Sequence, residues 1–202
     1  MKKFTTVDPR IKVKIPDLLE SPVVVRVNKF NEEAAEKFAE NMGKAHETGQ
    51  DIIPVIIDSY GGEVYSLMSM VSEVQNSSLP VAMICESKAM SAGSILFTFG
   101  TEGYRYMAPH GTLMIHEVSS FQYGKVEDLK VDAEEADRLN DLIFKLMAKN
   151  CGKDENYFLD IIHEKGHTDW YLTPKEAKKH NLVNHIKVPE MHVDVKVEMH
   201  FL

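Results

Sequence analysis

Short apolar runs rich in Val and Ile alternate along this chain with segments whose apolar residues recur at helical spacing. Residues 22–27 form the first such run, and residues 52–57 and 81–85 form the next two. Runs of this kind are typical of strands buried on both faces, and the segments between them are typical of helices that cover a sheet. The repeated order of strand and helix predicts an α/β fold with a mainly parallel sheet.

Start and stop signals place three helices in the first half of the chain. Asn31 is expected to cap a helix that Gly49 ends, because Asn is a preferred N-cap and Gly a preferred terminator. A second helix is expected after Gly62. Residues 91–99 are small and apolar, which predicts a buried helix that ends at Gly100.

Further strands and one long helix are expected around these elements. Pro54, inside the second apolar run, indicates either an edge strand or the beginning of a strand. Residues 103–107 and 112–115 are predicted to be strands. Residues 126–150 form the longest periodic segment, with one apolar face and many charges elsewhere, and predict a single amphipathic helix.

The C-terminal part carries a specific helix-start signal. Thr173, Pro174 and Glu176 match a capping box with proline at the first helical position, so a short helix should run to about residue 181. A strand over 182–188 should follow. Residues 192–201 alternate strictly between apolar and polar side chains, which predicts a last strand with one buried face.

Composition narrows the class of protein. The 202 residues fit one domain, and the formal net charge of −8 disfavours nucleic acid and anionic membranes as partners. Cys85 and Cys151 are too few for a disulfide scaffold or a thiolate zinc site, so a reducing compartment is expected. Charges and prolines interrupt the basic start before any signal peptide could form, and residues 89–101 are too short an uncharged stretch to span a bilayer.

Several residue types at the predicted strand ends could carry nucleophilic chemistry. Gly61 and Gly62 would let the backbone approach a ligand and present N–H donors, although paired glycines are also ordinary turn residues. Ser91 could be a helix cap or a nucleophile beside a helix N-terminus, and Ser94 competes with it. His116 ends a predicted strand, where a general base would be held rigidly.

Two further patterns lie in the C-terminal third. Asp169 could orient an imidazole as the third member of a triad, or it could be a turn aspartate. His163, Glu164 and His167 match the H-E-x-x-H zinc pattern, which needs a helix that continues through the second histidine. Gly166 is expected to end that helix, and no third ligand stands out, so we expect no metal site.

The order and spacing of four segments resemble the ClpP family of serine peptidases. They are Asp58-Ser59-Tyr60-Gly61-Gly62, Met90-Ser91-Ala92-Gly93, Met114-Ile115-His116-Glu117 and Asp169-Trp170-Tyr171-Leu172-Thr173. The resemblance runs from about residue 22 to residue 185. The chain departs from the family at Tyr60, where proline is usual, and at Glu117-Val118, where Gln-Pro is usual.

This resemblance implies roles for particular residues. Ser91 would be the nucleophile, His116 the general base and Asp169 its orienting partner. The N–H groups of Gly62 and Ala92 would form the oxyanion hole. The substrate-binding residues implied in the same way are Gly61, Glu63, Val64, Glu117 and Val118.

The resemblance also implies a fold and partners. The expected fold is a crotonase-like (ClpP-like) α/β spiral of βαβ units, a single domain over residues 1–202, with a head at about 22–120 and 167–188. Residues 126–150 would be a protruding handle helix and residues 192–201 a C-terminal strand. The family implies two stacked heptameric rings, a tetradecamer that encloses the active sites. Unfolded polypeptides would be fed to it by an ATP-dependent AAA+ unfoldase of Clp type in the cytoplasm, with no cofactor.

Two alternatives stay open at this point. The chain could be a catalytically silent scaffold subunit of a mixed ClpP-type ring, although a complete Ser-His-Asp set argues for an enzyme. It could also resemble the signal-peptide peptidases that use a Ser-Lys dyad, with Lys88 as the nearest candidate base.

Overall fold

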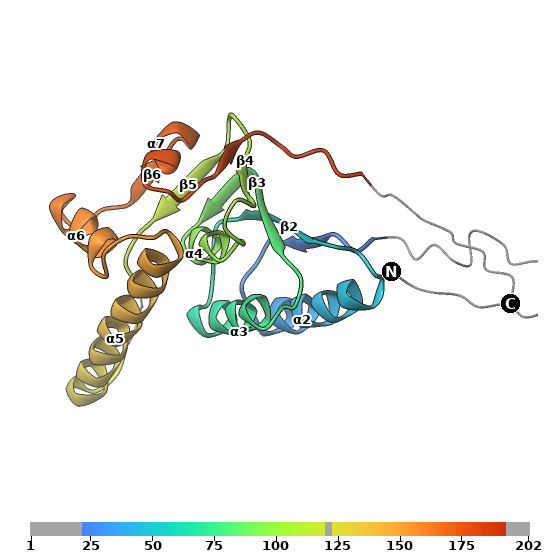
Figure 1. Cartoon of the computed structure of the whole chain (residues 1–202). Helices are drawn as coiled ribbons and strands as arrows, with labels where there is room; N and C mark the ends of the chain where they lie inside the picture. The colour runs from blue at the N-terminus through green and yellow to red at the C-terminus, as the bar shows by residue number, and fades with distance from the viewer. Residues whose placement is uncertain (1–21, 120–122, 193–202) are drawn as a thin grey trace, which may run out of the picture.

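A central sheet organises the computed structural model, which describes residues 22–119 and 123–192 (Figure 1). Five of its seven strands follow the order β1-β2-β3-β4-β7. The other two lie off this path, because β5 pairs with β3 and β6 pairs with β5. All pairs are parallel except β5 with β6. The strands are β1 (Val25–Val27), β2 (Ile53–Ser59), β3 (Val81–Met90), β4 (Arg105–Met107), β5 (Thr112–Ile115), β6 (Trp170–Leu172) and β7 (His185–Ile186).

Six helices surround this sheet in the described part of the chain. α2 and α3 lie side by side on one side of it, and α6 and α7 lie near β5 and β6 (Figure 1). The α/β class with a mainly parallel sheet is therefore confirmed. The helices are α2 (Glu32–Glu47), α3 (Val64–Gln75), α4 (Ala92–Thr98), α5 (Val126–Asn150), α6 (Tyr157–Glu164) and α7 (Pro174–Lys179).

The predicted helix starts are confirmed where a side chain caps them. The Asn31 side chain accepts a hydrogen bond of 2.9 Å from the Ala34 N–H at the start of α2. At the start of α7, Thr173 and Glu176 form the expected reciprocal capping box. These caps satisfy N–H groups that have no partner within the helix. Short local patterns therefore located the starts of both helices well.

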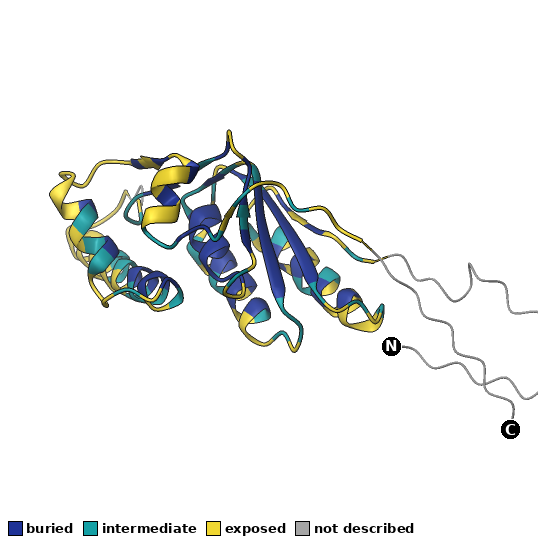
Figure 2. Cartoon of the chain, turned by 45° about the horizontal axis from the view of Figure 1, so that its top comes forward, coloured by how far each residue is buried: buried dark blue, intermediate teal, exposed yellow. Residues whose placement is uncertain are grey.

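The core lies between the sheet and its helices, where Figure 2 shows β2, the first half of β3 and α4 in the colour of buried residues. Every residue of α4 is buried. β2 is buried at all but one position, which agrees with its continuous apolar sequence.

Strand β3 continues five residues beyond its predicted end at Cys85. Its first half pairs with β4 and its second half, from Lys88 to Met90, pairs with β5. The polar residues of the second half gain ladder partners and an ion pair between Lys88 Nζ and Asp58 Oδ1 at 2.6 Å. Tertiary pairing therefore overrides the polar local sequence, and the longer strand carries the chain to Ser91.

Pro54 lies at the beginning of a strand, as its second residue, and does not mark an edge. β2 has a neighbour on both sides, β1 and β3. The register with β1 starts at Val25 opposite Val55, one residue after the proline. The missing N–H of Pro54 thus falls outside that ladder.

The strand predicted over residues 182–188 is shorter than expected, because only His185 and Ile186 pair with β4.

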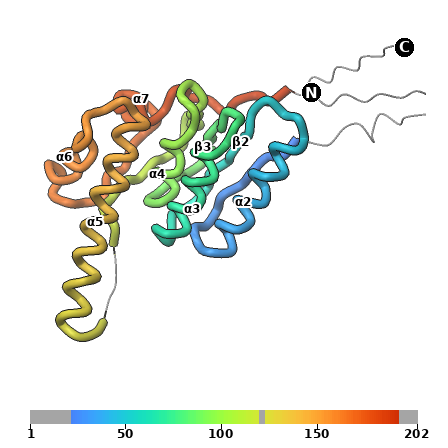
Figure 3. Tube along the Cα trace, turned by 60° about the horizontal axis from the view of Figure 1, so that its bottom comes forward, coloured from blue at the N-terminus to red at the C-terminus, as the bar shows by residue number. Residues whose placement is uncertain are grey.

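Helix α5 spans the predicted residues 126–150 and has two different halves. Its C-terminal half is buried through Leu139, Ile143, Phe144 and Met147. Its first turns extend away from the other elements (Figure 3), and Leu129 there is 38% exposed. Further along, Glu135 accepts a hydrogen bond of 2.7 Å from the Tyr65 hydroxyl of α3.

The strand predicted at the C-terminal end falls almost entirely outside the described residues. Of the strand predicted over residues 192–201, His192 is described and lies in no strand, and residues 193–201 lie outside the description. Across residues 22–119 and 123–192, no helix is both long and apolar enough to cross a membrane.

Candidate active site

Ser91 lies at a strained turn between β3 and α4. Its backbone has φ 53° and ψ −123°, a combination that a residue with a side chain rarely adopts. Hydrogen bonds hold the turn, because the Ser91 N–H donates to the Met114 carbonyl at 2.8 Å and the Ser91 carbonyl accepts from the Ile95 N–H at 3.2 Å. A sharp strand-to-helix turn of this kind exposes a hydroxyl at the end of a strand.

Gly61 and Gly62 lie against this turn and against Phe30. A Cβ on Gly61 would be 2.7 Å from Ser91 Cβ and 3.1 Å from Ser91 Oγ, and φ is +106° there. A Cβ on Gly62, where φ is +152°, would collide with the Phe30 carbonyl oxygen. Both positions therefore require glycine, for close approach as well as for conformation.

Two N–H groups beside Ser91 are candidate oxyanion donors. Ala92 is the first residue of α4, so its N–H has no acceptor within the helix. Within the described chain Gly62 N–H donates to no backbone carbonyl outside the regular elements, whereas the neighbouring Glu63 N–H donates to Phe30 at 2.9 Å.

A small pocket joins these groups to His116. Gly62, Ser91 and Ala92 line one side of it, and His116 lines it from the end of β5. The apolar part of the wall comes from α3, α4 and α5, with the residues Val64, Leu67, Ile95, Ile143 and Phe144. The pocket thus combines a hydroxyl, an imidazole and free N–H donors with a surface that fits an apolar side chain.

Asp169 approaches His116 through strand pairing. Ile115 of β5 pairs with Trp170 of β6 in antiparallel register, so His116 and Asp169 are the next residues along the two strands. Asp169 is exposed and does not line the pocket. Among the described side chains, no hydrogen bond joins His116 to Ser91 or to Asp169, and the three groups are neighbours without forming a closed triad.

Ser94 has a different environment from Ser91. It is 1% exposed, and its hydroxyl donates to the Ser91 carbonyl at 2.7 Å. A buried hydroxyl that already bonds to the backbone has no access to a substrate carbonyl. The geometry therefore favours Ser91 over Ser94 as the reactive hydroxyl.

Lys88 forms an ion pair with Asp58. Its ammonium lies 2.6 Å from Asp58 Oδ1 and 4.5 Å from the centre of the Tyr60 ring. The hydrogen bond to Asp58 raises the pKa of Lys88 above its usual value, with burial opposing it. A lysine base must be neutral, so these contacts oppose the dyad alternative.

The five predicted substrate-binding residues divide into two groups. Val64, Glu117 and Val118 line the pocket, whereas Gly61 and Glu63 do not. The Glu63 carboxylate instead accepts a hydrogen bond of 2.9 Å from the Ser66 hydroxyl at the start of α3.

Helix α5 contributes pocket residues that sequence reasoning did not predict. Ile143 and Phe144 form part of the apolar wall, and Asn140 Oδ1 accepts a hydrogen bond of 2.6 Å from the Val118 N–H. The apolar period of α5 indicated a buried face, but no local signal tells which segment that face will contact.

The H-E-x-x-H segment ends a helix, as predicted. α6 stops at Glu164, and Gly166 and His167 adopt φ values of +73° and +59°. The two histidine rings nevertheless lie together, with centroids 4.6 Å apart.

Comparison with known protein families identifies a match for this chain. A family model described as Clp protease matches residues 9–190. The match includes the strained serine turn, the two glycines, His116 and Asp169, and it extends over nearly the whole sequence. The chain therefore belongs to the Clp protease family.

Proposed function

We propose that this protein is a serine endopeptidase that cleaves unfolded polypeptides, with Ser91 as its nucleophile. The observation that carries the proposal is the strained turn at Ser91, packed against Gly61 and facing the same pocket as His116. Strained backbone at a strand-to-helix turn recurs at active sites because the surrounding structure must maintain it. Membership of a peptidase family supports the same chemistry.

The proposed reaction assigns one role to each group. Ser91 Oγ attacks the scissile carbonyl carbon while His116 takes the hydroxyl proton, and the carbonyl oxygen becomes an oxyanion. The Gly62 and Ala92 N–H groups donate to that oxygen. His116 then returns the proton to the leaving amine, and a water molecule hydrolyses the acyl-enzyme by the same steps. Asp169 orients the imidazole and stabilises its charged form.

The open arrangement of the three side chains requires a closing step. Catalytic hydrogen bonds are often long without substrate and tighten in the Michaelis complex. His116 directly follows β5 and Asp169 directly precedes the neighbouring strand β6, so rotation of their side chains is the movement that we propose. We expect substrate binding or subunit assembly to supply this step.

The proposed substrate is an extended chain. The main chain of a substrate must pass close to Gly61 and Gly62 to reach Ser91. A folded protein cannot present its main chain in this way. The apolar wall formed by Val64, Leu67 and Phe144 would hold one apolar side chain beside the cleaved bond.

We also propose the assembly and partners that the family suggests. The protruding half of α5 would act as the handle of a crotonase-like fold and pack between subunits of two stacked heptameric rings. A Clp-type AAA+ unfoldase would deliver unfolded polypeptides to the chamber. A cytoplasmic location fits the two free, buried cysteines.

Fluorophosphonate labelling of the purified protein tests the proposal directly. We expect one adduct, which mass mapping assigns to Ser91, and loss of that adduct in Ser91→Ala. Ser119→Ala is the matched control, because Ser119 lines the same pocket and is exposed. Labelling that persists in Ser91→Ala would refute the assignment, and an adduct on Ser94 would transfer the role to that residue. A folded protein with no adduct would favour the silent scaffold.

A further inference from the structure

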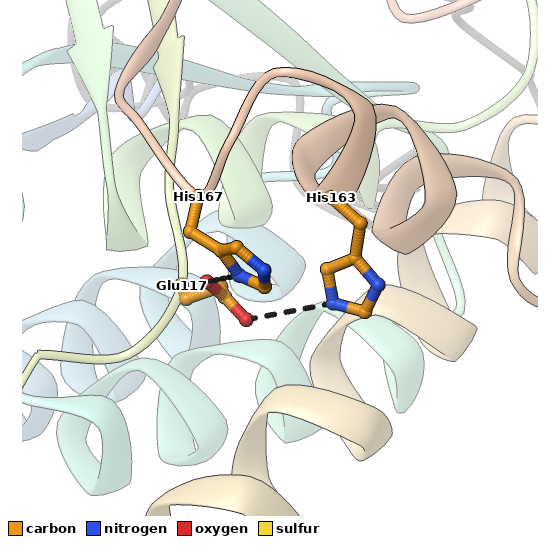
Figure 4. A group of neighbouring side chains, drawn as sticks. All are labelled: Glu117, His163 and His167. Carbon is orange, nitrogen blue, oxygen red and sulfur yellow. Dashed lines mark hydrogen bonds and ion pairs between the residues drawn. The ribbon is translucent and has the colours of Figure 1, made fainter.

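Three side chains converge beside the pocket, on the side where α6 ends. Figure 4 shows Glu117, which follows His116 in the chain, beside the His167 ring and with its carboxylate directed towards both His163 and His167. Glu117 Oε2 lies 2.7 Å from His167 Nδ1, and Glu117 Oε1 lies 3.8 Å from His163 Nε2. The sequence alone indicated no third ligand for the two histidines, and the structure supplies one.

We propose that Glu117, His163 and His167 form a binding site for a divalent transition metal of the zinc class. Each residue offers one ligand atom, and these atoms all lie within 4.8 Å of one another. Ligands about 2.0–2.1 Å from a tetrahedral zinc ion lie about 3.3 Å from each other. The distances of 2.7 Å and 3.8 Å from the two Glu117 carboxylate oxygens to the histidine nitrogens bracket this value. Modest side-chain rotations would therefore bring one carboxylate oxygen and both imidazoles onto one ion.

The donor set selects the metal. Two imidazole nitrogens and one carboxylate oxygen suit zinc and its neighbours in the transition series, and hard cations such as Mg²⁺ prefer oxygen alone. His163, His167 and Glu117 have side-chain exposures of 47%, 58% and 26%, so solvent can reach the ion and occupy a fourth position.

A turn after the end of α6, and not the helix itself, positions His167 beside His163. α6 ends at Glu164, so a continuous helix does not set the spacing of the histidines. Instead the His167 N–H donates to the Ile162 carbonyl at 3.0 Å, and the left-handed conformations of Gly166 and His167 turn the chain back. Backbone hydrogen bonds within the chain hold this folded-back turn, which lowers the ordering that binding would require.

This site is distinct from the proposed catalytic groups and does not depend on peptidase activity. A bound ion would connect the segment after β5 to the end of α6. Glu117 adjoins His116 in the chain, so the ion would restrict the residue next to the proposed base.

Zinc titration of the untagged, chelator-treated protein tests the site. Calorimetry should show one Zn²⁺ per chain, and His163→Ala and Glu117→Gln should each weaken binding by about tenfold or more. His167→Asn is the preferred third variant, because Asn tolerates the left-handed backbone at this position and removes the imidazole. Zinc should raise the melting temperature of the unaltered chain and leave that of His163→Ala nearly unchanged.

Two control variants separate this site from other histidines. His185→Ala removes an imidazole remote from the cluster, and His116→Ala removes the one in the pocket. Both should still bind one Zn²⁺, and circular dichroism of every variant should match that of the unaltered chain. Equal affinity in the ligand variants, loss of binding in His116→Ala, or no binding to the unaltered chain would overturn the proposal and leave a Glu117–His167 hydrogen bond only. None of these outcomes bears on Ser91 labelling.

Discussion

At the scale of single residues, the two cysteines combine complete burial with a strong preference for the protonated form. Cys85 is 0% exposed and Cys151 is 1% exposed. Desolvation raises the pKa of each thiol to about 12. Only the thiolate is an effective nucleophile, so both residues should be inert in the folded protein.

Thiol reactivity is therefore expected to report unfolding. At pH 8 an aromatic disulfide reagent should modify neither cysteine on the time scale of minutes, and both should react after urea is added. Modification of Cys85 at the same rate with and without urea would contradict the burial of this residue.

The raised thiol pKa values also predict how stability depends on pH. In the unfolded chain a cysteine titrates near pH 8.5, whereas the folded thiols stay protonated to about pH 12. The folded protein then binds more protons, so its free energy of unfolding falls as the pH rises above about 8.5. Urea unfolding at pH 8 and pH 10 should show this fall, and Cys85→Ala should make it smaller. An unchanged slope in Cys85→Ala would contradict the prediction.

The proposed triad predicts a characteristic loss pattern. Ser91→Ala and His116→Ala should each abolish nearly all peptide cleavage, and the double variant should be little worse than either alone, because the residues act as a unit. Asp169→Asn should lower kcat by about 10⁴-fold through the wrong imidazole tautomer. Thr168→Ala, a change at the adjacent exposed residue, is the control. Independent, multiplying losses in the double variant would argue against a shared mechanism.

At the scale of elements, helix caps were predictable and long-range pairing was not. Asn31 and Thr173 bond to backbone within three residues, so local sequence determines those helix starts. The extension of β3 beyond Cys85 depends on pairing with β5, which lies more than 20 residues further along the chain.

The same distinction applies to the candidate site. Ser91, His116 and Asp169 could be named from strand ends and family resemblance, because each lies in a recognisable local segment. The hydrogen bond from Val118 to Asn140 and the contact of Glu117 with two histidines join segments distant in sequence. No local pattern encodes such contacts, and only the folded chain reveals them.

The bond between α5 and the segment after β5 makes Asn140 a positioning residue for the pocket. Asn140→Ala should destabilise the protein by about 1 kcal/mol and leave the Val118 N–H without its acceptor. We expect slower fluorophosphonate labelling of Ser91 in this variant. Asn140→Asp keeps an acceptor oxygen and should restore labelling towards the original rate. Equal labelling in Asn140→Ala and the unaltered chain would show that this bond does not position the pocket.

At the scale of the whole molecule, the apolar face of α5 continues beyond the core that covers it. Ile143 and Met147 are buried, and the same face leads through Ala136 and Ala133 to Leu129, which is 38% exposed. A helix face of this kind needs an apolar partner, and the described part of one chain does not provide one for the N-terminal half. This supports assembly through α5.

Charge placed on this face should therefore break the assembly. Light scattering of the unaltered protein at micromolar concentration should show a large oligomer, and a monomer would remove the chamber proposal. Leu129→Glu with Ala133→Glu should yield smaller species with unchanged helix content, because burying two carboxylates without partners is unfavourable. Val131→Glu is the matched control, since Val131 is 64% exposed on the same half of the helix but off the apolar face. Dissociation by Val131→Glu and not by the double variant would place the contact on the opposite face of α5.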